Sequence, residues 1–170
     1  MIDVRPETAA DFEPIREVLL DAFPEPLEAD LVEALRQDAE GCISLVAEEA
    51  GQIVGHIMFS PVTLEEKTVV YKMAGLAPMA VRSSHQNKGI GSKLVEEGLK
   101  VCLAEGYRVV VVLGHPEYYP RFGFEVSTQF GLKSQYDVPE EVFMAQVLGD
   151  TTVPDLAGTI VYHACFQALG

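Results

Sequence analysis

The strongest hydrophobic pattern lies in the middle of the chain. Over residues 89–105 apolar side chains recur every three or four positions, which predicts an amphipathic helix packed on a flat surface. Residues 108–113 follow as one arginine and five apolar residues, a run typical of a strand covered on both faces. Residues 76–81, before the helix, are also strand-like. Strand, helix and strand together predict a βαβ unit whose two strands are parallel.

Shorter segments with helical or strand periodicity lie on both sides of this unit. Two helices are predicted before it, one over residues 12–23 and one over residues 27–36. Strands are predicted over residues 2–5, 42–48, 52–59, 69–71 with 76–81, 124–126, 143–148 and 158–166, and a short helix over residues 116–122. We expect Pro61 to end the strand over 52–59. A bulge or bend is expected at residues 74–75 and again at Pro78.

Length and composition describe one globular unit. The chain has 170 residues, enough for one well-buried core and too few for two. Hydrophobic residues make up 48% and charged residues 22%, which excludes the disordered and low-complexity classes. Neither a linker nor a repeat divides the sequence, so we expect residues 1–170 to form a single domain.

Charge and cysteine content exclude further classes. The formal net charge is −14, and so acidic a chain is not expected to bind nucleic acid or an anionic membrane. No apolar run is long enough to span a membrane and the first residues do not resemble a signal peptide, so we expect a cytoplasmic protein. Three cysteines without ligand spacing indicate neither a disulfide framework nor a metal site. Residues 67–134 carry nine bases and five acids, which indicates either a solvated surface or an anionic ligand.

The loop into the central helix carries the most informative local chemistry. It reads Gln86-Asn87-Lys88-Gly89-Ile90-Gly91-Ser92. Glycines two residues apart at a helix start leave the first backbone N–H groups accessible, and these groups together with the helix dipole bind phosphate. Lys88 and Lys93 add positive charge close by. The string lacks the GKS or GKT ending of a P-loop and the three glycines of a dinucleotide site, so its weight comes from its position inside a βαβ unit.

Three ordered motifs resemble those of the GNAT superfamily of acyl-CoA-dependent N-acetyltransferases. The family pattern Gln/Arg-x-x-Gly-x-Gly/Ala matches Gln86 to Gly91, and residues 76–81 match the strand before it. A later Tyr-x-x-x-Gly-Phe pattern matches Tyr119 to Phe124. The stretch His115-Pro116-Glu117-Tyr118-Tyr119 is similar to one found in a bacterial subgroup of small members.

This resemblance implies a fold and a cosubstrate. The fold is of the α/β (α+β) class, a mixed and mostly antiparallel sheet with a central parallel βαβ unit and flanking helices. The strands that end at Val81 and Leu113 splay apart in such a fold and admit the pantetheine arm of acetyl-CoA. The implied cofactor-binding residues are Met79, Ala80, Val81, Gln86, Asn87, Lys88, Gly89, Ile90, Gly91 and Ser92. Tyr119 is implied as the catalytic residue that protonates the departing thiolate, and no metal is expected.

The implied function is transfer of an acetyl group from acetyl-CoA to a primary amine of a small molecule or peptide, by direct attack in a ternary complex. A non-catalytic acyl-CoA-binding or sensing module is the alternative, and the presence of Tyr119 favours the enzyme. His56, His115 and Glu28 are candidates for a general base, and the sequence singles out none of them. The acidic remainder of the chain favours a cationic acceptor as a hypothesis, and residues 127–157 are expected to shape the acceptor pocket. The sequence does not distinguish a monomer from a homodimer, or acetyl from longer acyl groups.

Overall fold

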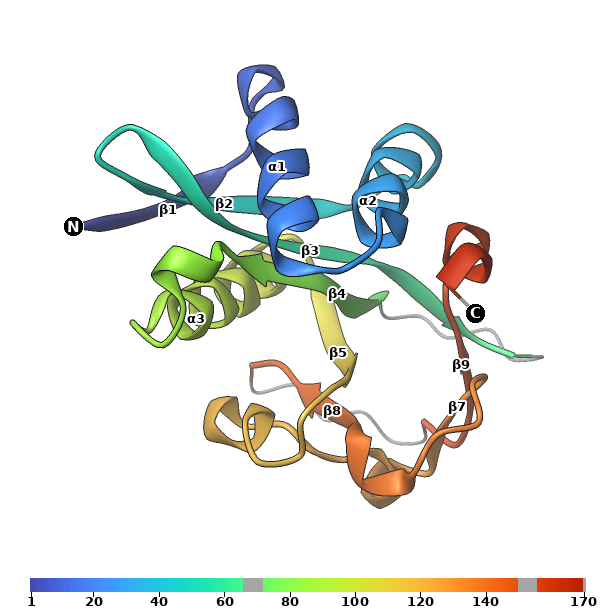
Figure 1. Cartoon of the computed structure of the whole chain (residues 1–170). Coiled ribbons are helices and arrows are strands. Elements are labelled where there is room, and N and C mark those ends of the chain that lie inside the picture. The colour runs from blue at the N-terminus through green and yellow to red at the C-terminus, as the bar shows by residue number, and fades with distance from the viewer. Residues whose placement is uncertain (66–71, 150–155, 170) are drawn as a thin grey trace.

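A nine-stranded sheet organises the described part of the chain. The computed structural model describes residues 1–65, 72–149 and 156–169 (Figure 1). Its strands are β1 (Ile2–Pro6), β2 (Ile43–Glu49), β3 (Gln52–Leu64), β4 (Lys72–Val81), β5 (Tyr107–Leu113), β6 (Glu125–Val126), β7 (Leu132–Ser134), β8 (Phe143–Val147) and β9 (Gly158–Val161). Its helices are α1 (Phe12–Ala22), α2 (Leu27–Asp38) and α3 (Ile90–Ala104), with 3₁₀ segments η1 (Ala9–Asp11), η2 (Ser83–His85), η3 (Tyr119–Phe122), η4 (Ser127–Phe130), η5 (Glu140–Val142) and η6 (Ala164–Leu169).

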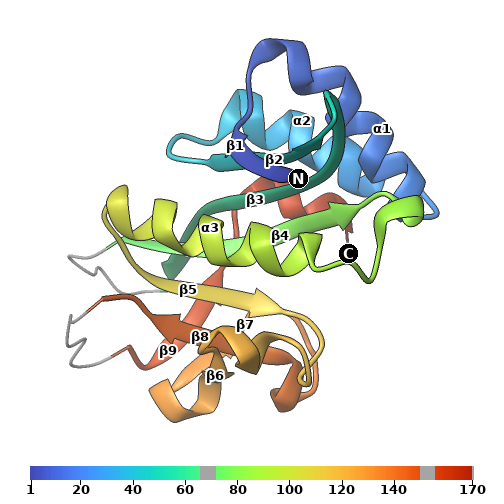
Figure 2. The same ribbon diagram turned by 90° about the vertical axis from the view of Figure 1, so that its left-hand side faces the viewer.

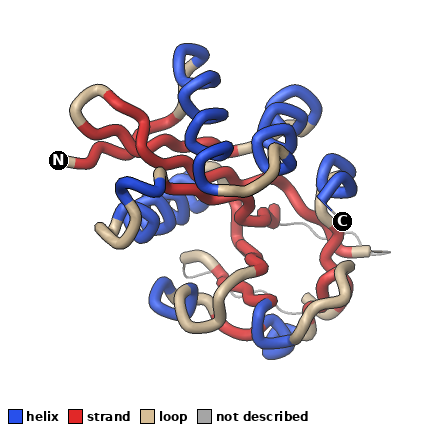
Figure 3. Tube along the Cα trace, viewed as in Figure 1, coloured by secondary structure: helices blue, strands red, loops and turns tan. Residues whose placement is uncertain are grey.

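Strand pairing confirms the predicted fold class. The main strand order is β1-β2-β3-β4-β5-β8-β6, and β9 pairs with both β3 and β7. Strands β4 and β5 are parallel and are connected through α3, as the hydrophobic pattern predicted. Strands β7 and β9 form a second parallel pair, whereas the other pairs are antiparallel. Figure 3 shows that the layer of strands curves strongly, so that the last strands come to face the middle of the sheet.

Helices cover both faces of the central strands. The buried side chains of α1 and α2 pack in one core cluster, and those of α3 pack in another on the opposite face of the sheet. Gly98 lies where α3 contacts β3, and a Cβ atom added there would be 2.5 Å from the ring of Phe59, which is fully buried. The glycine in the apolar face of this helix therefore lets α3 lie directly on the strand.

Three local expectations are corrected by the pairing. Strand β3 does not end at Pro61 but continues to Leu64, because β2 pairs no further than Phe59 and a proline is tolerated where one edge of a strand has lost its neighbour. The last strand ends at Val161 instead of residue 166, since the chain there turns into η6. The pairing with β3 is regular at residues 74–75, so the bend expected there is wrong. The bend expected at Pro78 is confirmed.

The structure also shows one bulge in β4 and one strand that the sequence did not predict. The bulge at Pro78 arises because β4 has one residue more than β3 between the pairs Phe59↔Leu76 and Ile57↔Met79. The short strand β7 was not expected from the sequence, and residues 69–71, expected as strand, lie outside the described residues.

A buried carboxylate joins the first strand to the first helix. Asp11 accepts two hydrogen bonds from the Arg5 guanidinium, at 2.7 and 3.0 Å, and one from the backbone N–H of Thr8 at 2.7 Å. Arg5 also donates to Glu48 of β2 at 2.9 Å. These bonds, with Arg5 as the largest contributor, lower the pKa of Asp11 to about 2. Asp11 thereby fixes the start of α1 against the sheet edge.

We expect Asp11→Asn to lower the free energy of unfolding by about 1–2 kcal/mol at pH 7, because it removes the charge that Arg5 and the Thr8 N–H stabilise. The native pKa is depressed, so the stabilisation is complete above the unfolded value near 4 and is lost as the pH falls toward 2. Urea unfolding at pH 7, 4 and 2.5 measures this dependence. A difference between the two proteins that stays constant over this range would contradict the assignment.

Candidate active site

The site is built where β4 and β5 part. The last pair between them is Leu76↔Val112, yet β4 continues to Val81. On its other edge β4 remains paired with β3 up to Gly55↔Val81. Figure 2 shows the two strands side by side at their amino ends and diverging toward their carboxyl ends. Among the described strands none occupies the free edge of β4 beyond Leu76, so its backbone groups are available to an extended ligand.

The loop after β4 presents backbone N–H groups at the start of α3. Asn87 and Gly89 both adopt left-handed backbone conformations, with φ of 63° and 82°. Successive N–H groups in such a turn, followed by a helix N-terminus, form a concave binding site for an anion. A Cβ atom at Gly89 would contact nothing within 4 Å, so this side of the loop is open.

A depression of about 410 Å³ lies over this loop. Seven of the ten expected binding residues line it. Val81 does so at the end of β4, and the others belong to the loop and the first turn of α3: Gln86, Asn87, Gly89, Ile90, Gly91 and Ser92. The Ile90 side chain is buried in the core, so this residue offers only its backbone. Met79, Ala80 and Lys88 are outside the lining; the first two lie on the free edge of β4 and Lys88 is exposed.

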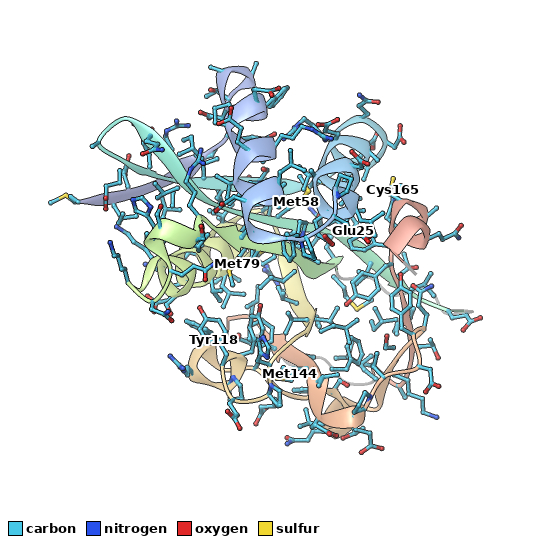
Figure 4. All side chains as sticks on the ribbon, viewed as in Figure 1. Glu25, Met58, Met79, Tyr118, Met144 and Cys165 are labelled. Carbon is cyan, nitrogen blue, oxygen red and sulfur yellow. The ribbon has the colours of Figure 1, made fainter. Side chains whose placement is uncertain are left out.

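Three lining residues were not expected from the sequence: His85, Tyr118 and Arg121. The Tyr118 hydroxyl lies 3.2 Å from Ser92 Oγ, and the Arg121 guanidinium lies 5.0 Å from the centre of the Tyr118 ring. Figure 4 shows Met79, on β4, and Tyr118, on the segment after β5, facing each other across the opening between these two parts of the chain. Because Tyr118 and Arg121 follow β5 whereas Ser92 begins α3, only the three-dimensional fold brings a guanidinium to the depression. The only local indication in the sequence was that Arg121 lies within the aromatic stretch from Tyr118 to Phe124.

Tyr119 begins η3, six residues after the end of β5, and is not among the described residues that line the depression. Its ring packs edge-on against Tyr118 and Phe124 and covers Gly114, where a Cβ atom would be 2.3 Å from the ring. The side chain is 7% exposed. Burial raises the pKa of Tyr119 to about 12, with a smaller contribution from Tyr118. The phenol is therefore neutral at physiological pH and can donate a hydrogen bond.

The three candidates for a general base differ in accessibility. His56 is fully buried on β3, its Nε2 atom lies 2.8 Å from Ser44 Oγ, and burial lowers its pKa to about 4. It cannot reach a substrate. His115 is exposed and its carbonyl accepts the backbone N–H of Tyr118 at 3.1 Å. Glu28 is half-buried in the first turn of α2. None of the three is among the described residues that line the depression.

Side-chain contacts hold the loop in place. Asp21, near the end of α1, accepts hydrogen bonds from the backbone N–H and hydroxyl of Ser83 at 2.6 and 3.2 Å. The N–H of Ser83 is the main reason why the pKa of Asp21 is lowered. Gln86 Nε2 donates to the Val81 carbonyl at 3.1 Å, which closes the turn between β4 and α3. Lys93 donates to the Ile2 carbonyl on β1, so its charge points away from the loop toward that strand.

Two features are absent from the part of the chain that the structure describes. Within residues 1–65, 72–149 and 156–169, no group of three or more His, Cys, Asp or Glu side chains is placed to hold a metal ion. No helix among those described has the length and apolar character needed to cross a membrane.

Comparison with known proteins places this geometry in a family. A model of the acetyltransferase (GNAT) domain matches residues 3–127. The chain belongs to the GNAT acetyltransferase family. This membership confirms the family and the class of activity that the motifs between residues 76 and 124 implied.

Relatives in the GNAT family match most of the chain. The uncharacterised N-acetyltransferase YhbS of Escherichia coli is 34% identical over 165 residues, which cover 96% of this chain and 98% of YhbS. The crystal structure of YhbS in complex with CoA has a TM-score of 0.90 with 33% identity and covers 99% of this chain and 93% of that one. A GNAT acetyltransferase from Brucella melitensis, solved with acetyl-CoA, has a TM-score of 0.79 with 35% identity and covers 98% of both chains.

Removal of the Asp21 carboxylate is expected to loosen the loop. In Asp21→Ala, Ser83 loses the acceptors of both its N–H and its hydroxyl, so hydrogen exchange of the backbone amides at residues 83–85 becomes faster than in the parent protein. Exchange measured by mass spectrometry on peptides covering this segment tests the effect. The paired strands β1 and β2 serve as the internal control and keep their exchange rate. Equal exchange at residues 83–85 in both proteins would mean that Asp21 does not hold the loop.

Proposed function

We propose that this protein is an acetyl-CoA-dependent N-acetyltransferase that acetylates a primary amine by direct attack in a ternary complex. One observation carries the proposal: the free edge of β4 beyond Leu76 runs straight into the left-handed loop that starts α3. This arrangement offers one continuous strip of backbone donors and acceptors that ends at an anion site. A ligand with amide groups at one end and a diphosphate at the other fits it, and CoA is such a molecule.

Each part of CoA has a proposed partner in the chain. Met79, Ala80 and Val81 would bind the amides of the pantetheine arm as an added strand does. The N–H groups between Asn87 and Ser92 would bind the diphosphate, with Arg121 adding positive charge. Two GNAT relatives that are 33% and 35% identical were crystallised with CoA and acetyl-CoA, which supports this assignment.

The chemistry needs a polarised carbonyl and a stabilised leaving thiolate. Backbone N–H groups near Ala80 and Val81 would polarise the thioester carbonyl and stabilise the tetrahedral intermediate. Tyr119 would donate a hydrogen bond to the thiolate. Proton transfer from a phenol of pKa about 12 to the thiolate of a thiol of pKa about 8.5 is uphill by roughly 5 kcal/mol, so hydrogen bonding rather than complete transfer is the role proposed for Tyr119.

The acceptor must be neutral to attack. An alkylamine of pKa near 10.4 loses its proton at pH 7 at a cost of about 4.6 kcal/mol, whereas an α-amine near 7.8 needs only about 1 kcal/mol. His56 is inaccessible and is not a base in this proposal. A cytoplasmic location is proposed with the function, and it is supported by the three cysteines, which are all free thiols.

The anion site is tested by two variants of equal shape at Gly89. Asparagine and aspartate tolerate left-handed backbone better than other side chains, and the space beside Gly89 is open. We expect Gly89→Asp to bind CoA about tenfold more weakly than Gly89→Asn, because only the former opposes the diphosphate charge. Calorimetry measures both affinities, and the ratio is expected to shrink as salt is raised. Equal affinities would remove the diphosphate from this loop.

The role of Tyr119 is tested by Tyr119→Phe, which keeps the ring against Gly114 and Phe124. We expect kcat to fall by about 10- to 100-fold because the hydrogen-bond donor is lost, with CoA affinity unchanged. Thiol release from acetyl-CoA in the presence of an amine panel measures kcat. An unchanged kcat would remove the proposed role. Binding of acetyl-CoA without turnover of any amine by the parent protein would favour the sensing module instead.

A further inference from the structure

A second, apolar cavity of about 420 Å³ opens at the same divergence of β4 and β5. Its described lining consists of Leu76 and Ala77 on β4, Leu113 at the end of β5, Tyr136 and Val138 after β7, and Tyr162 and Phe166 after β9. In Figure 1 β9 runs along the end of β3 and lies across from β5 and β8. The cavity has the size of pockets that hold small ligands in other proteins.

The cavity lies next to the groups proposed for catalysis but on the other side of the sheet. Leu113 lines the cavity, and the Tyr119 ring packs directly on the next residue, Gly114. Ala77, Leu113, Tyr136, Val138, Tyr162 and Phe166 all pack with the core that α1 and α2 cover, whereas Tyr119 packs with the core under α3. A molecule in the cavity therefore approaches the opening between β4 and β5 from the side opposite to α3.

The walls of the cavity are held by defined contacts. The Tyr162 ring packs against β4, and a Cβ atom at Gly75 would be 2.7 Å from it. The backbone N–H of Tyr162 donates to Gln135 Oε1, which ties β9 to the segment carrying Tyr136. The Tyr162 ring also packs against Tyr136 and Phe166, with centroid distances of 5.8 and 5.1 Å. The three aromatic rings thus form one supported wall.

The described lining of the cavity is apolar apart from two phenol hydroxyls. Within the part of the chain that the structure describes, none of the lining residues is charged, and the phenol hydroxyls of Tyr136 and Tyr162 are its polar side-chain groups. Burial raises the pKa of both phenols, so neither supplies negative charge at neutral pH. Glu25 lies on the loop between α1 and α2 and is exposed, outside this lining (Figure 4). A second ammonium group in the cavity would therefore lose its water and find no carboxylate among the described lining residues, only phenol oxygens and ring faces.

We propose that this cavity holds the acceptor, and that the acceptor is a monoamine whose amino group is attached to an aliphatic or aromatic group that fills the apolar space. The proposal rests on the proposed acetyltransferase function and specifies its substrate class. It replaces the cationic acceptor expected from the net charge of −14, because the acids of the chain are absent from the described walls. The amino group faces the opening between β4 and β5, and the apolar remainder contacts Val138, Tyr162 and Phe166.

A series of amines tests the proposal on the unmodified protein. From propylamine to hexylamine we expect kcat/KM to rise about fourfold per methylene, the effect of burying each CH₂, until the cavity is filled. 1,6-Diaminohexane is expected to be at least about tenfold poorer than hexylamine. Acyl-CoA donors from acetyl to hexanoyl form the parallel series. Increments that follow the acyl chain instead of the amine would overturn the proposal, since the cavity would then hold the acyl group.

Two variants of equal shape at Val138 isolate charge. Val138 is half-buried in a loop, and Val138→Asp and Val138→Asn differ only in the carboxylate. We expect the ratio of kcat/KM for 1,6-diaminohexane to that for hexylamine to be at least about tenfold higher in the aspartate variant than in the asparagine variant. Calorimetric binding of 2-phenylethylamine to the CoA-saturated parent protein gives a readout that needs no turnover. Equal ratios, or no binding of this amine, would overturn the proposal.

The outcomes separate this inference from the function on which it rests. Turnover of polar or polycationic amines without dependence on chain length would leave the acetyltransferase intact and overturn the apolar acceptor site. Absence of acetyl-CoA binding would overturn the proposed function itself. Should Val138→Asp fail to fold, the amine and acyl series on the parent protein still decide between the two occupants of the cavity.

Discussion

A strand edge inside a folded protein needs hydrogen-bond partners, and the architecture follows from how β4 meets this requirement. As far as Leu76 the partner is β5. Beyond it β5 turns away at Gly114, while β4 stays bound to β3 on its other edge and keeps its direction to Val81. The backbone groups on the open edge are left to solvent or to a ligand that is itself extended and rich in amides. An opening of this kind creates a binding site without any charged side chain.

The two sides of that opening have opposite character. On the α3 side, backbone N–H groups of a left-handed loop and the guanidinium of Arg121 suit an anion. On the α1 and α2 side, aromatic and aliphatic side chains enclose a space without charge among its described walls. Tyr119 packs in the core on the α3 side, and burial raises the pKa of its phenol. The net charge of −14 describes neither side, since both depend on which few groups reach the opening.

The sequence predicted those parts of the molecule that are contiguous along the chain. Helix α3 has a clear hydrophobic period and β5 contains a continuous apolar run. The predicted binding residues from Met79 to Ser92 run without a break from the end of β4 through the loop into the start of α3, so the fold class and the loop could be predicted. Tyr118 and Arg121 reach the loop from beyond β5, and the cavity combines β4 with residues after β9, contacts that no local pattern reports. The wrong prediction that β3 ends at Pro61 has the same origin. A strand can continue through a proline where its neighbour has ended, and the end of β2 opposite Phe59 is a tertiary feature.

The bond between Asp21 and Ser83 links two segments that are 62 positions apart. Helix α1 ends beside it and leads into the connection to α2, whereas Ser83 belongs to the turn that shapes the anion site. An insertion or deletion in the α1–α2 connection that moved the end of α1 would therefore also displace the turn between β4 and α3. This bond makes the position of that turn and the length of the α1–α2 connection depend on each other.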